Sequence, residues 1–489
     1  MHGAPHTVVI SDVHLTTAVE PDPKRPLWKR FQQRDLFCDP DLVAMLRHAR
    51  ADAREAGRTL ELVLDGDIFD FDAATRLPDD DRFKVGWLER LRGLNPTEEK
   101  SAWKLERILD EHPEVVLALQ ELLDDGDRLV FVVGNHDLDL HWPAVQAVLH
   151  RRLDPEGTRD LRVCAWFYLS NGDTLIEHGH QYDTYCLCQD PVSPVIRTRP
   201  QGPGRIRLPF GNYASRYMSN GMGLFNPHAD KAFVMPFWGY VDFFYRHVAR
   251  TQPLLVWTWI WTSAATFVAS LRDGLLPAER DVVGLEDRVE EIARTSQATP
   301  RVVRALDALR AHPAIFHPWK VYRELWLDRL TLVLLVIVGS FQLLATINVL
   351  VGVSLAWWFL VFGALLVPFI FYAKQVRSDV DNLEGELRRR LPLLQRVTGV
   401  RRLVLGHTHV PRHDVLGGME VLNAGTWAPA YRDVACTEPV WRRHVVRIRP
   451  TSTAGRRATL EAWTGDHFDV VSSGSPGGPA RTPSVVAAK

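Results

Sequence analysis

Short apolar runs alternate with longer amphipathic stretches over residues 5 to 190. Apolar runs bounded by turn residues predict strands, and apolar positions three or four residues apart predict helices. The expected strands are Thr7–Ile10, Leu60–Leu64, Arg128–Val133 and Thr174–Glu177, and the expected helices are Pro40–Ala56 and Glu114–Leu123. This alternation predicts an α/β fold, in which ligand-binding groups gather in loops at the carboxyl ends of the strands.

A different pattern begins at Leu330, where 44 residues through Ala373 contain no charged side chain. One spanning helix needs about 20 apolar residues, so the segment predicts a transmembrane helical hairpin that turns near Asn348–Ser354. The alternative is a buried hairpin in a soluble protein. Basic residues flank both ends: Lys320, Arg323, Arg329, Lys374 and Arg377. By the positive-inside tendency, both ends are expected in the cytoplasm.

The uncharged, Trp-rich segment Thr251–Leu271 precedes this hairpin. A crossing here would be the third and would place chemical motifs found before and after it on opposite sides of the membrane. We therefore expect this segment to lie at the membrane interface or to pack against protein, since Trp favours the headgroup region. The apolar run Thr7–Ile10 is shorter than the roughly 7–15 residues of a signal peptide's apolar region. These patterns predict a protein of the cell inner membrane with its catalytic domain on the cytoplasmic side.

The predicted organisation is a catalytic domain interrupted by a long insertion. Its parts are residues 1–190, the first part of the catalytic domain; 191–329, a helical, aromatic-rich insertion that is partly interfacial; 330–373, the transmembrane hairpin; 374–397, an amphipathic helix whose arginines face anionic headgroups; 398–470, the second part of the catalytic domain; and 471–489, a disordered tail.

Charge and cysteine content narrow the class of protein. The chain has 58 basic and 59 acidic residues and a formal net charge of −1, which gives no global field to attract nucleic acid. Its five cysteines are odd in number and scattered, unlike a disulfide framework. No nucleic-acid partner is expected, and the sequence sets no oligomeric state.

Five motifs with metal-ligand chemistry follow the predicted strands. They are Asp12-Val13-His14, Gly66-Asp67-Ile68-Phe69-Asp70, Gly134-Asn135-His136-Asp137, His178-Gly179 and Gly406-His407-Thr408-His409. Each motif alone is common, but all five in this order at strand ends predict one metal centre. Mixed oxygen and imidazole ligands suit Mn²⁺ best here, with Fe or Zn²⁺ as alternatives, and suit Ca²⁺ less.

In this order the motifs resemble the calcineurin-like metallophosphoesterase superfamily over about residues 5–185 and 398–450. The chain looks like a membrane-anchored bacterial member. The resemblance implies a four-layer α/β/β/α sandwich around two divalent metal ions. Asp12, His14 and His409 would bind one metal, Asn135, His178 and His407 the other, and Asp67 would bridge them.

The resemblance also implies a catalytic role for His136 beside the leaving group, as a general acid or transition-state stabiliser. Asp70 and Asp137 are expected to orient the metal ligands or His136, and Asp70 is therefore grouped with His136. The alternative is that both are loop carboxylates that cap helices. His180, next to the matching His178, either touches substrate or lies on a polar rim.

The activity expected is hydrolysis of a phosphomonoester, phosphodiester or pyrophosphate by a hydroxide that two metals activate. The predicted hairpin favours a membrane-associated or lipid-like substrate. Bacterial UDP-diacylglucosamine pyrophosphatases are similar in the His-Gly and Gly-His-Thr-His motifs, but they carry Arg where this chain has His136, which argues against that activity. The alternatives are a membrane-anchored phosphodiesterase for a soluble nucleotide and a non-catalytic membrane scaffold.

Overall fold

The computed structural model describes most of the chain. The described residues are 5–198, 202–224, 226, 228, 242, 244–248, 254–279, 282–354, 356–357, 359–361, 363–364, 369, 372, 383–439, 443–452 and 455–473. Residues 474–489 of the predicted tail and much of the second half of the predicted hairpin lie outside these residues, whereas residues 471–473, predicted to be disordered, form the end of a strand that pairs in a sheet.

A seven-stranded sheet has the order β14-β13-β12-β1-β2-β3-β4. Its strands are β1 (His6–Ile10), β2 (Leu60–Asp65), β3 (Arg128–Val132), β4 (Leu161–Cys164), β12 (Arg443–Pro450), β13 (Arg456–Trp463) and β14 (Phe468–Ser473). The first four strands are parallel, and β12 joins antiparallel to β1 through Val8 and Arg447. The sheet therefore combines strands from both ends of the chain.

A five-stranded sheet has the order β10-β11-β9-β6-β5. Its strands are β5 (Phe167–Ser170), β6 (Thr174–Glu177), β9 (Arg402–Leu405), β10 (Arg412–Leu416) and β11 (Met419–Asn423). Strand β6 pairs parallel with β9, although more than 220 residues separate them, with Leu175 opposite Leu403. This pairing brings the chain on either side of the insertion into one sheet.

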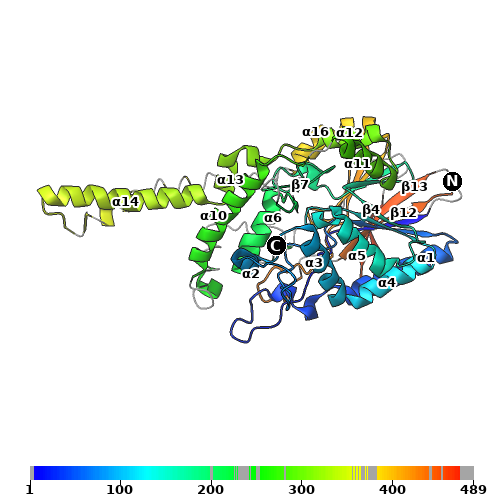
Figure 1. The fold of residues 1–489 in the computed structure, drawn as a ribbon, viewed down its shortest axis with the longest axis horizontal. Helices are drawn as coiled ribbons and strands as arrows, with labels where there is room; N and C mark the ends of the chain where they lie inside the picture. The colour runs from blue at the N-terminus through cyan, green and yellow to red at the C-terminus, as the bar shows by residue number, and fades with distance from the viewer. Residues whose placement is uncertain are drawn as a thin grey trace.

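The two sheets stack face to face between two layers of helices (Figure 1). Helices α1 (Asp39–Glu55), α3 (Glu98–Glu111), α4 (Pro113–Asp124) and α5 (Pro143–Leu153) pack on the large sheet. Helices α11 (Val282–Thr295), α12 (Pro300–Leu309) and α16 (Leu383–Thr398) pack on the small one. The predicted α/β/β/α sandwich is confirmed, and the predicted strands that it contains agree with the observed bounds to within a residue.

The hydrophobic contacts between the sheets are mostly aliphatic, beside a buried polar network around Glu61. Val9, Val63 and Val130 of the large sheet meet Val404 and Leu422 of the small one, all fully buried. Alternate residues of the same strands face the helices, as the two-residue period of a strand requires. Strands buried on both faces read as continuous apolar runs, which explains the pattern from which they were predicted.

The outer layer on the small sheet comes from the long insertion and its flank. Leu387, Leu391 and Leu394 of α16 are buried in this layer. Arg388 and Arg390 of the same helix pair with Glu384 and Glu386. Helix α16 is amphipathic as expected, but its apolar face packs on the catalytic domain and these two arginines have carboxylate partners.

A second group of helices lies beside the sandwich at the end from which α14 projects (Figure 1). It contains α2 (Trp87–Arg92), α6 (Phe210–Ala214), the π-helical turn η5 (Ser215–Ser219), α7 (Asn220–Met222), α10 (Leu255–Gly274), α13 (Pro318–Glu324) and α14 (Leu327–Leu350). Within the described chain, α14 is the one helix long and apolar enough to cross a membrane.

Helix α14 projects from the body with most of its side chains exposed. Its 24 residues extend about 36 Å at 1.5 Å per residue, enough for a hydrocarbon core of about 30 Å. At its base, the hydroxyl of Tyr372 donates to Asp328 (2.6 Å). The two ends of the predicted hairpin segment therefore lie side by side.

Candidate metal centre

The loops after β1, β2, β3, β6 and β9 meet at one end of the two sheets. They carry all seven residues that the motifs predicted as ligands: Asp12 and His14 after β1, Asp67 after β2, Asn135 after β3, His178 after β6, and His407 and His409 after β9. Because the parallel strands end at the same edge, residues distant in sequence come together without long side chains.

Asp67 lies between two groups of possible ligands. Its Oδ2 is 3.1 Å from His178 Nε2 and 3.9 Å from His14 Nε2. Asp12 Oδ1 is 3.0 Å from His409 Nε2 and 4.0 Å from His14 Nε2. Two groups spaced for metal binding share Asp67: one with Asp12 and His14, the other with His178 and His407.

Several of these atoms are buried without a well-directed hydrogen bond. They are Asp12 Oδ1, His14 Nε2, Asn135 Oδ1 and His178 Nε2. Buried polar atoms are nearly always paired in folded proteins, so a cluster of such atoms indicates a ligand. Carboxylate oxygen, amide oxygen and imidazole nitrogen fit divalent metal ions, and the residues present therefore fit the predicted metals.

Neighbouring groups fix the orientation of the imidazoles. The backbone oxygen of Asp65 lies 3.0 Å from His178 Nδ1, and the backbone oxygen of His228 lies 3.0 Å from His409 Nδ1. Asp183 Oδ2 lies 2.9 Å from His407 Nε2. Such contacts set the tautomer and direction of an imidazole ligand.

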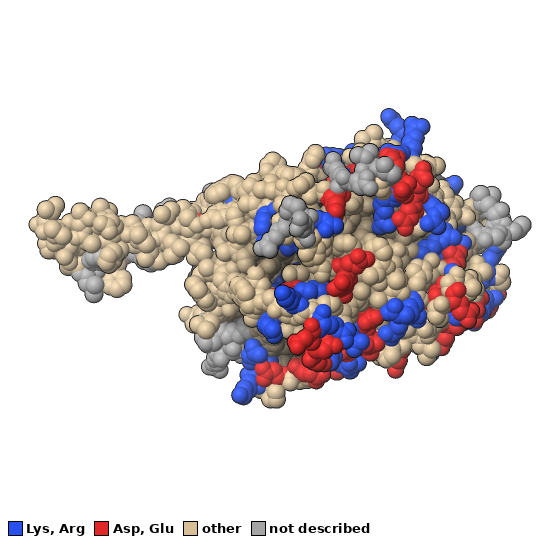
Figure 2. All heavy atoms as spheres, in the orientation of Figure 1, with Lys and Arg blue, Asp and Glu red and all other residues tan. Residues whose placement is uncertain are grey.

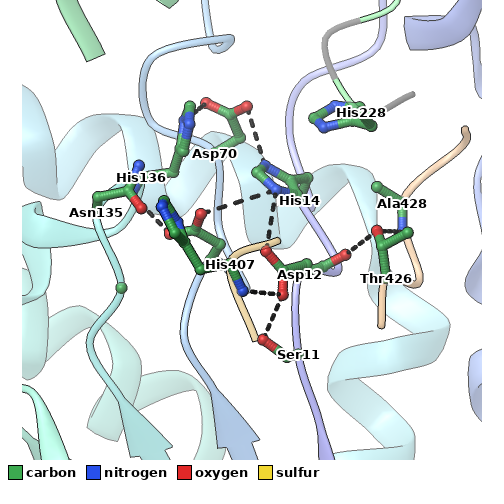
Figure 3. A network of polar contacts seen from close by, with 12 residues as sticks. Ser11, Asp12, His14, Asp70, Asn135, His136, His228, His407, Thr426 and Ala428 are labelled. Carbon is green, nitrogen blue, oxygen red and sulfur yellow. Dashed lines mark hydrogen bonds and ion pairs between the residues drawn. The ribbon is translucent and has the colours of Figure 1, made fainter. Parts of the chain in front are cut away.

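Asp70 joins His14 and His136 (Figure 3). Its two carboxylate oxygens are 3.3 Å from His14 Nδ1 and 3.2 Å from His136 Nδ1. Asp70 also accepts hydrogen bonds from the backbone nitrogens of Asp72 and Ala73, which hold its own loop. The side chain is thus placed to orient both histidines.

Asp137 connects two of the loops instead of contacting the imidazoles. Its carboxylate accepts hydrogen bonds from the backbone nitrogens of Ile68 (2.9 Å) and Gly134 (2.5 Å).

His180 lies beside His178, with ring centroids 5.5 Å apart, but belongs to none of the metal-spaced groups of the described residues.

The titration of the histidines follows from burial and from the surrounding carboxylates. Burial lowers the pKa of His14 below its usual value, which favours the neutral ring that binds metal. For His136 burial also lowers the pKa, but Asp70 and Asp67 outweigh it and hold the pKa well above its usual range. In His178 the same competition, with Asp67 and Asp12 prevailing over burial, raises the pKa to about 10. The acidic centre thus stabilises positive charge.

Five of the seven predicted ligands have left-handed backbone conformations. These are Asp12, His14, Asp67, His407 and His409, with φ between 52° and 67°. Non-glycine residues rarely adopt this region, and such strain persists where the surrounding structure enforces it. The loops are therefore bent to bring short side chains to one point.

The structure adds His228, which the sequence motifs did not indicate. Its ring lies beside that of His14 (Figure 3), with 4.2 Å between the ring centroids. The centroid of the His409 ring is 6.0 Å from that of His228. His14, His228 and His409 also form a metal-spaced group. His228 comes from the insertion, where no strand-end motif marks it, so only the tertiary structure identifies it.

A cavity of about 180 Å³ opens onto the centre. Seven motif residues form one side: His14, Asp67, Asp70, Asn135, His136, His407 and His409. The opposite side comes from the insertion: Gly211, Ser215, Ser219, Asn220 and His228. Five of the seven predicted ligands thus face a pocket whose remaining walls come from the insertion and from other residues of the catalytic domain, among them Phe31, Gln32 and Cys186.

Gly134 should be intolerant of any side chain. A Cβ at this position would lie 2.5 Å from the backbone nitrogen of Asp67 and closer still to its carboxylate. We expect Gly134→Ala to displace Asp67 and to lower metal content and activity by at least about tenfold, roughly 1.4 kcal/mol. Metal analysis after equilibration with Mn²⁺ measures the effect.

Gly86→Ala is the control, because a Cβ there makes only an ordinary contact of 3.6 Å with Glu89. Equal metal content in both variants would show that the close approach of the two loops does not matter.

Comparison with known proteins agrees with this geometry. Residues 5–215 match the family model of the calcineurin-like phosphoesterases, a family of phosphoester hydrolases that use divalent metal ions. No curated protein matches the chain. The matched segment carries Asp12, His14, Asp67, Asn135 and His178, and the fold adds His407 and His409 from outside it. The chain is therefore an enzyme with a calcineurin-like phosphoesterase domain, a hydrolase that acts on phosphoester bonds.

Proposed function

We propose that the protein is a two-metal phosphoesterase that hydrolyses a phosphomonoester, phosphodiester or pyrophosphate bond in a lipid-like substrate at the cytoplasmic face of the inner membrane. The observation that carries the catalytic part is the set of buried ligand atoms around Asp67 that have no well-directed hydrogen bond. The membrane part is supported by α14 and the uncharged segment that it begins.

The proposed ligands divide between two metals, with Mn²⁺ the first choice and Fe or Zn²⁺ the alternatives. Asp12, His14 and His409 hold one, and Asn135, His178 and His407 hold the other. Asp67 bridges them, which its position between His14 and His178 supports. When bound, two such ions neutralise charge on the phosphoryl oxygens and lower the pKa of the attacking water.

His136 is proposed to act on the leaving group. It lines the cavity and has a raised pKa because Asp70 and Asp67 outweigh the effect of burial. A protonated imidazole can donate a proton to the departing oxygen or stabilise its charge. Asp70 positions His136 through the 3.2 Å contact and holds His14 on its other oxygen.

Anchoring follows from the hairpin segment. A chain that enters the membrane at α14 and returns by Tyr372 leaves β6 and β9 on the same side, as their pairing requires. Basic residues at both ends favour the cytoplasm for that side. The competing function is an anchored phosphodiesterase for a soluble nucleotide, which would use the same metal centre.

Asp67→Ala removes the proposed bridging ligand. We expect loss of metal binding and of activity, because Asp67 is the carboxylate that belongs to both metal-spaced groups, one with Asp12 and His14 and the other with His178 and His407. Calorimetric titration with Mn²⁺ and metal analysis measure binding. The control Asp81→Ala, at an exposed position, should bind metal and turn over substrate as the unaltered chain does. Normal turnover by the Asp67→Ala variant would contradict the two-metal assignment.

His136→Ala should separate catalysis from metal binding. We expect metal content to remain and kcat to fall about 10²- to 10⁴-fold, the usual contribution of a general acid or base. The exposed His312→Ala is the matched control. A parallel loss of metal would instead make His136 a structural support of the centre.

A substrate comparison tests the lipid part of the proposal. With Mn²⁺ present, we expect kcat/KM for a phosphatidate or lipid diphosphate in vesicles to exceed that for a cyclic nucleotide or p-nitrophenyl phosphate by about tenfold or more, a difference of roughly 1.4 kcal/mol. The Asp67→Ala variant supplies the blank. Faster hydrolysis of the cyclic nucleotide would favour the soluble-substrate alternative.

A further inference from the structure

Helix α10 exposes large apolar side chains and buries polar ones, the opposite of a helix on a water-exposed surface. Most of the side chains that it buries are small and polar: Thr262, Ser263, Thr266, Ser270 and Asp273 are all at most 3% exposed, and Leu255 and Ala269 are the buried apolar ones. Its exposed side carries large apolar residues, with Trp257 64% and Val268 62% exposed. A soluble amphipathic helix buries its apolar side, so the surroundings of α10 are not water alone.

The polar side of α10 packs against protein, and part of it is hydrogen-bonded. Asp273 contacts Arg205 and the hydroxyl of Tyr213. Thr262 donates to the carbonyl oxygen of Thr258 (2.7 Å), one turn earlier in the helix. The Asp273 contacts and the packing of α10 on α6, η5 and α7 set which side faces the protein and leave Trp257 and Val268 outward.

The apolar side is continuous with the base of α14. Helix α10 contacts both α13 and α14. Trp319 is 61% exposed on α13, and Trp326 is exposed just before α14. Figure 1 shows α10 running across the point at which α14 leaves the body, and Figure 2 shows α14 and its junction with the body nearly free of charged side chains.

We propose that the outer side of α10, defined by Trp257, Ala264 and Val268, is embedded in the lipid bilayer beside α14. No charged residue occurs between Leu254 and Leu271. A docking site for a soluble protein has a polar rim around its apolar centre, whereas an uncharged, Trp-containing helix fits the boundary between headgroups and acyl chains.

This placement sets the metal pocket at the membrane surface. The inner side of α10 contacts α6, η5 and α7, and these three turns supply Gly211, Ser215, Ser219 and Asn220 to the cavity wall. Resting on the proposed function, this arrangement identifies the substrate as a phosphoester whose apolar tail remains in the bilayer while its headgroup reaches the metals.

Accessibility of a spin label on the full-length protein tests the lipid contact without any measure of activity. Trp257→Cys and Val268→Cys carry the nitroxide, Leu117→Cys on α4 is the exposed control, and the unsubstituted chain gives the background from the native cysteines. The protein is reconstituted in vesicles of phosphatidylethanolamine and phosphatidylglycerol. Relaxation by oxygen reports lipid, and relaxation by a water-soluble nickel chelate reports water.

We expect oxygen to relax the label more than the nickel chelate at 257 and 268, and the order to reverse at 117. Preference for the chelate at 257 and 268 would overturn the proposal, as would protection from both reagents, which would mean that protein covers α10.

A second experiment tests the lipid substrate: Val268→Glu should slow hydrolysis of a vesicle-borne lipid phosphoester but not of p-nitrophenyl phosphate. Lipid contact without this difference would reject the lipid substrate alone.

Discussion

The carboxylate of Asp12 accepts a hydrogen bond from the backbone nitrogen of His407, 395 residues later in the chain (3.0 Å) (Figure 3). Its other oxygen faces His409. These contacts exist only because β6 and β9 pair across the insertion and β1 pairs with β12. The metal centre therefore depends on closure of the whole sandwich. The chain between residues 178 and 402 must end beside β6, where it began, so that β9 can pair with β6.

The same closure maintains the strained loops. Left-handed backbone at Asp12, Asp67 and His407 costs on the order of 1–3 kcal/mol per residue, and mutual repulsion among Asp12, Asp67 and Asp70 adds to this cost. The aliphatic core between the sheets and the hydrogen bonds of Asp137 hold the loops in place. Bound cations would relieve the repulsion, so metal binding and stability are expected to be coupled.

The sequence predicted those elements and site residues that a short stretch of contiguous residues determines. Strands such as Leu60–Asp65 are buried on both faces, and their apolar runs predicted them directly. Motifs at strand ends predicted the residues that converge, although their roles as ligands stay predictions. His228 and Asp183 were not predicted as site residues, because a lone polar residue carries no pattern and long-range packing brings it to the centre. Helices α11 and α12 were predicted only as part of a helical insertion, with no role in the sandwich.

Because α11 and α12 belong to the sandwich, the insertion is part of the catalytic domain's fold as well as the proposed membrane anchor. Val289, Ile292, Val303 and Leu306 are buried against the small sheet, and burial of each such side chain contributes about 1.5–3 kcal/mol. Together they approach the roughly 5–15 kcal/mol by which a typical domain is stable. The insertion thus supplies the fourth layer of the sandwich, one wall of the metal pocket and, through α10 and α14, the proposed contact with lipid. A catalytic core without it would lose a layer as well as its anchor, so folding and membrane attachment share one segment.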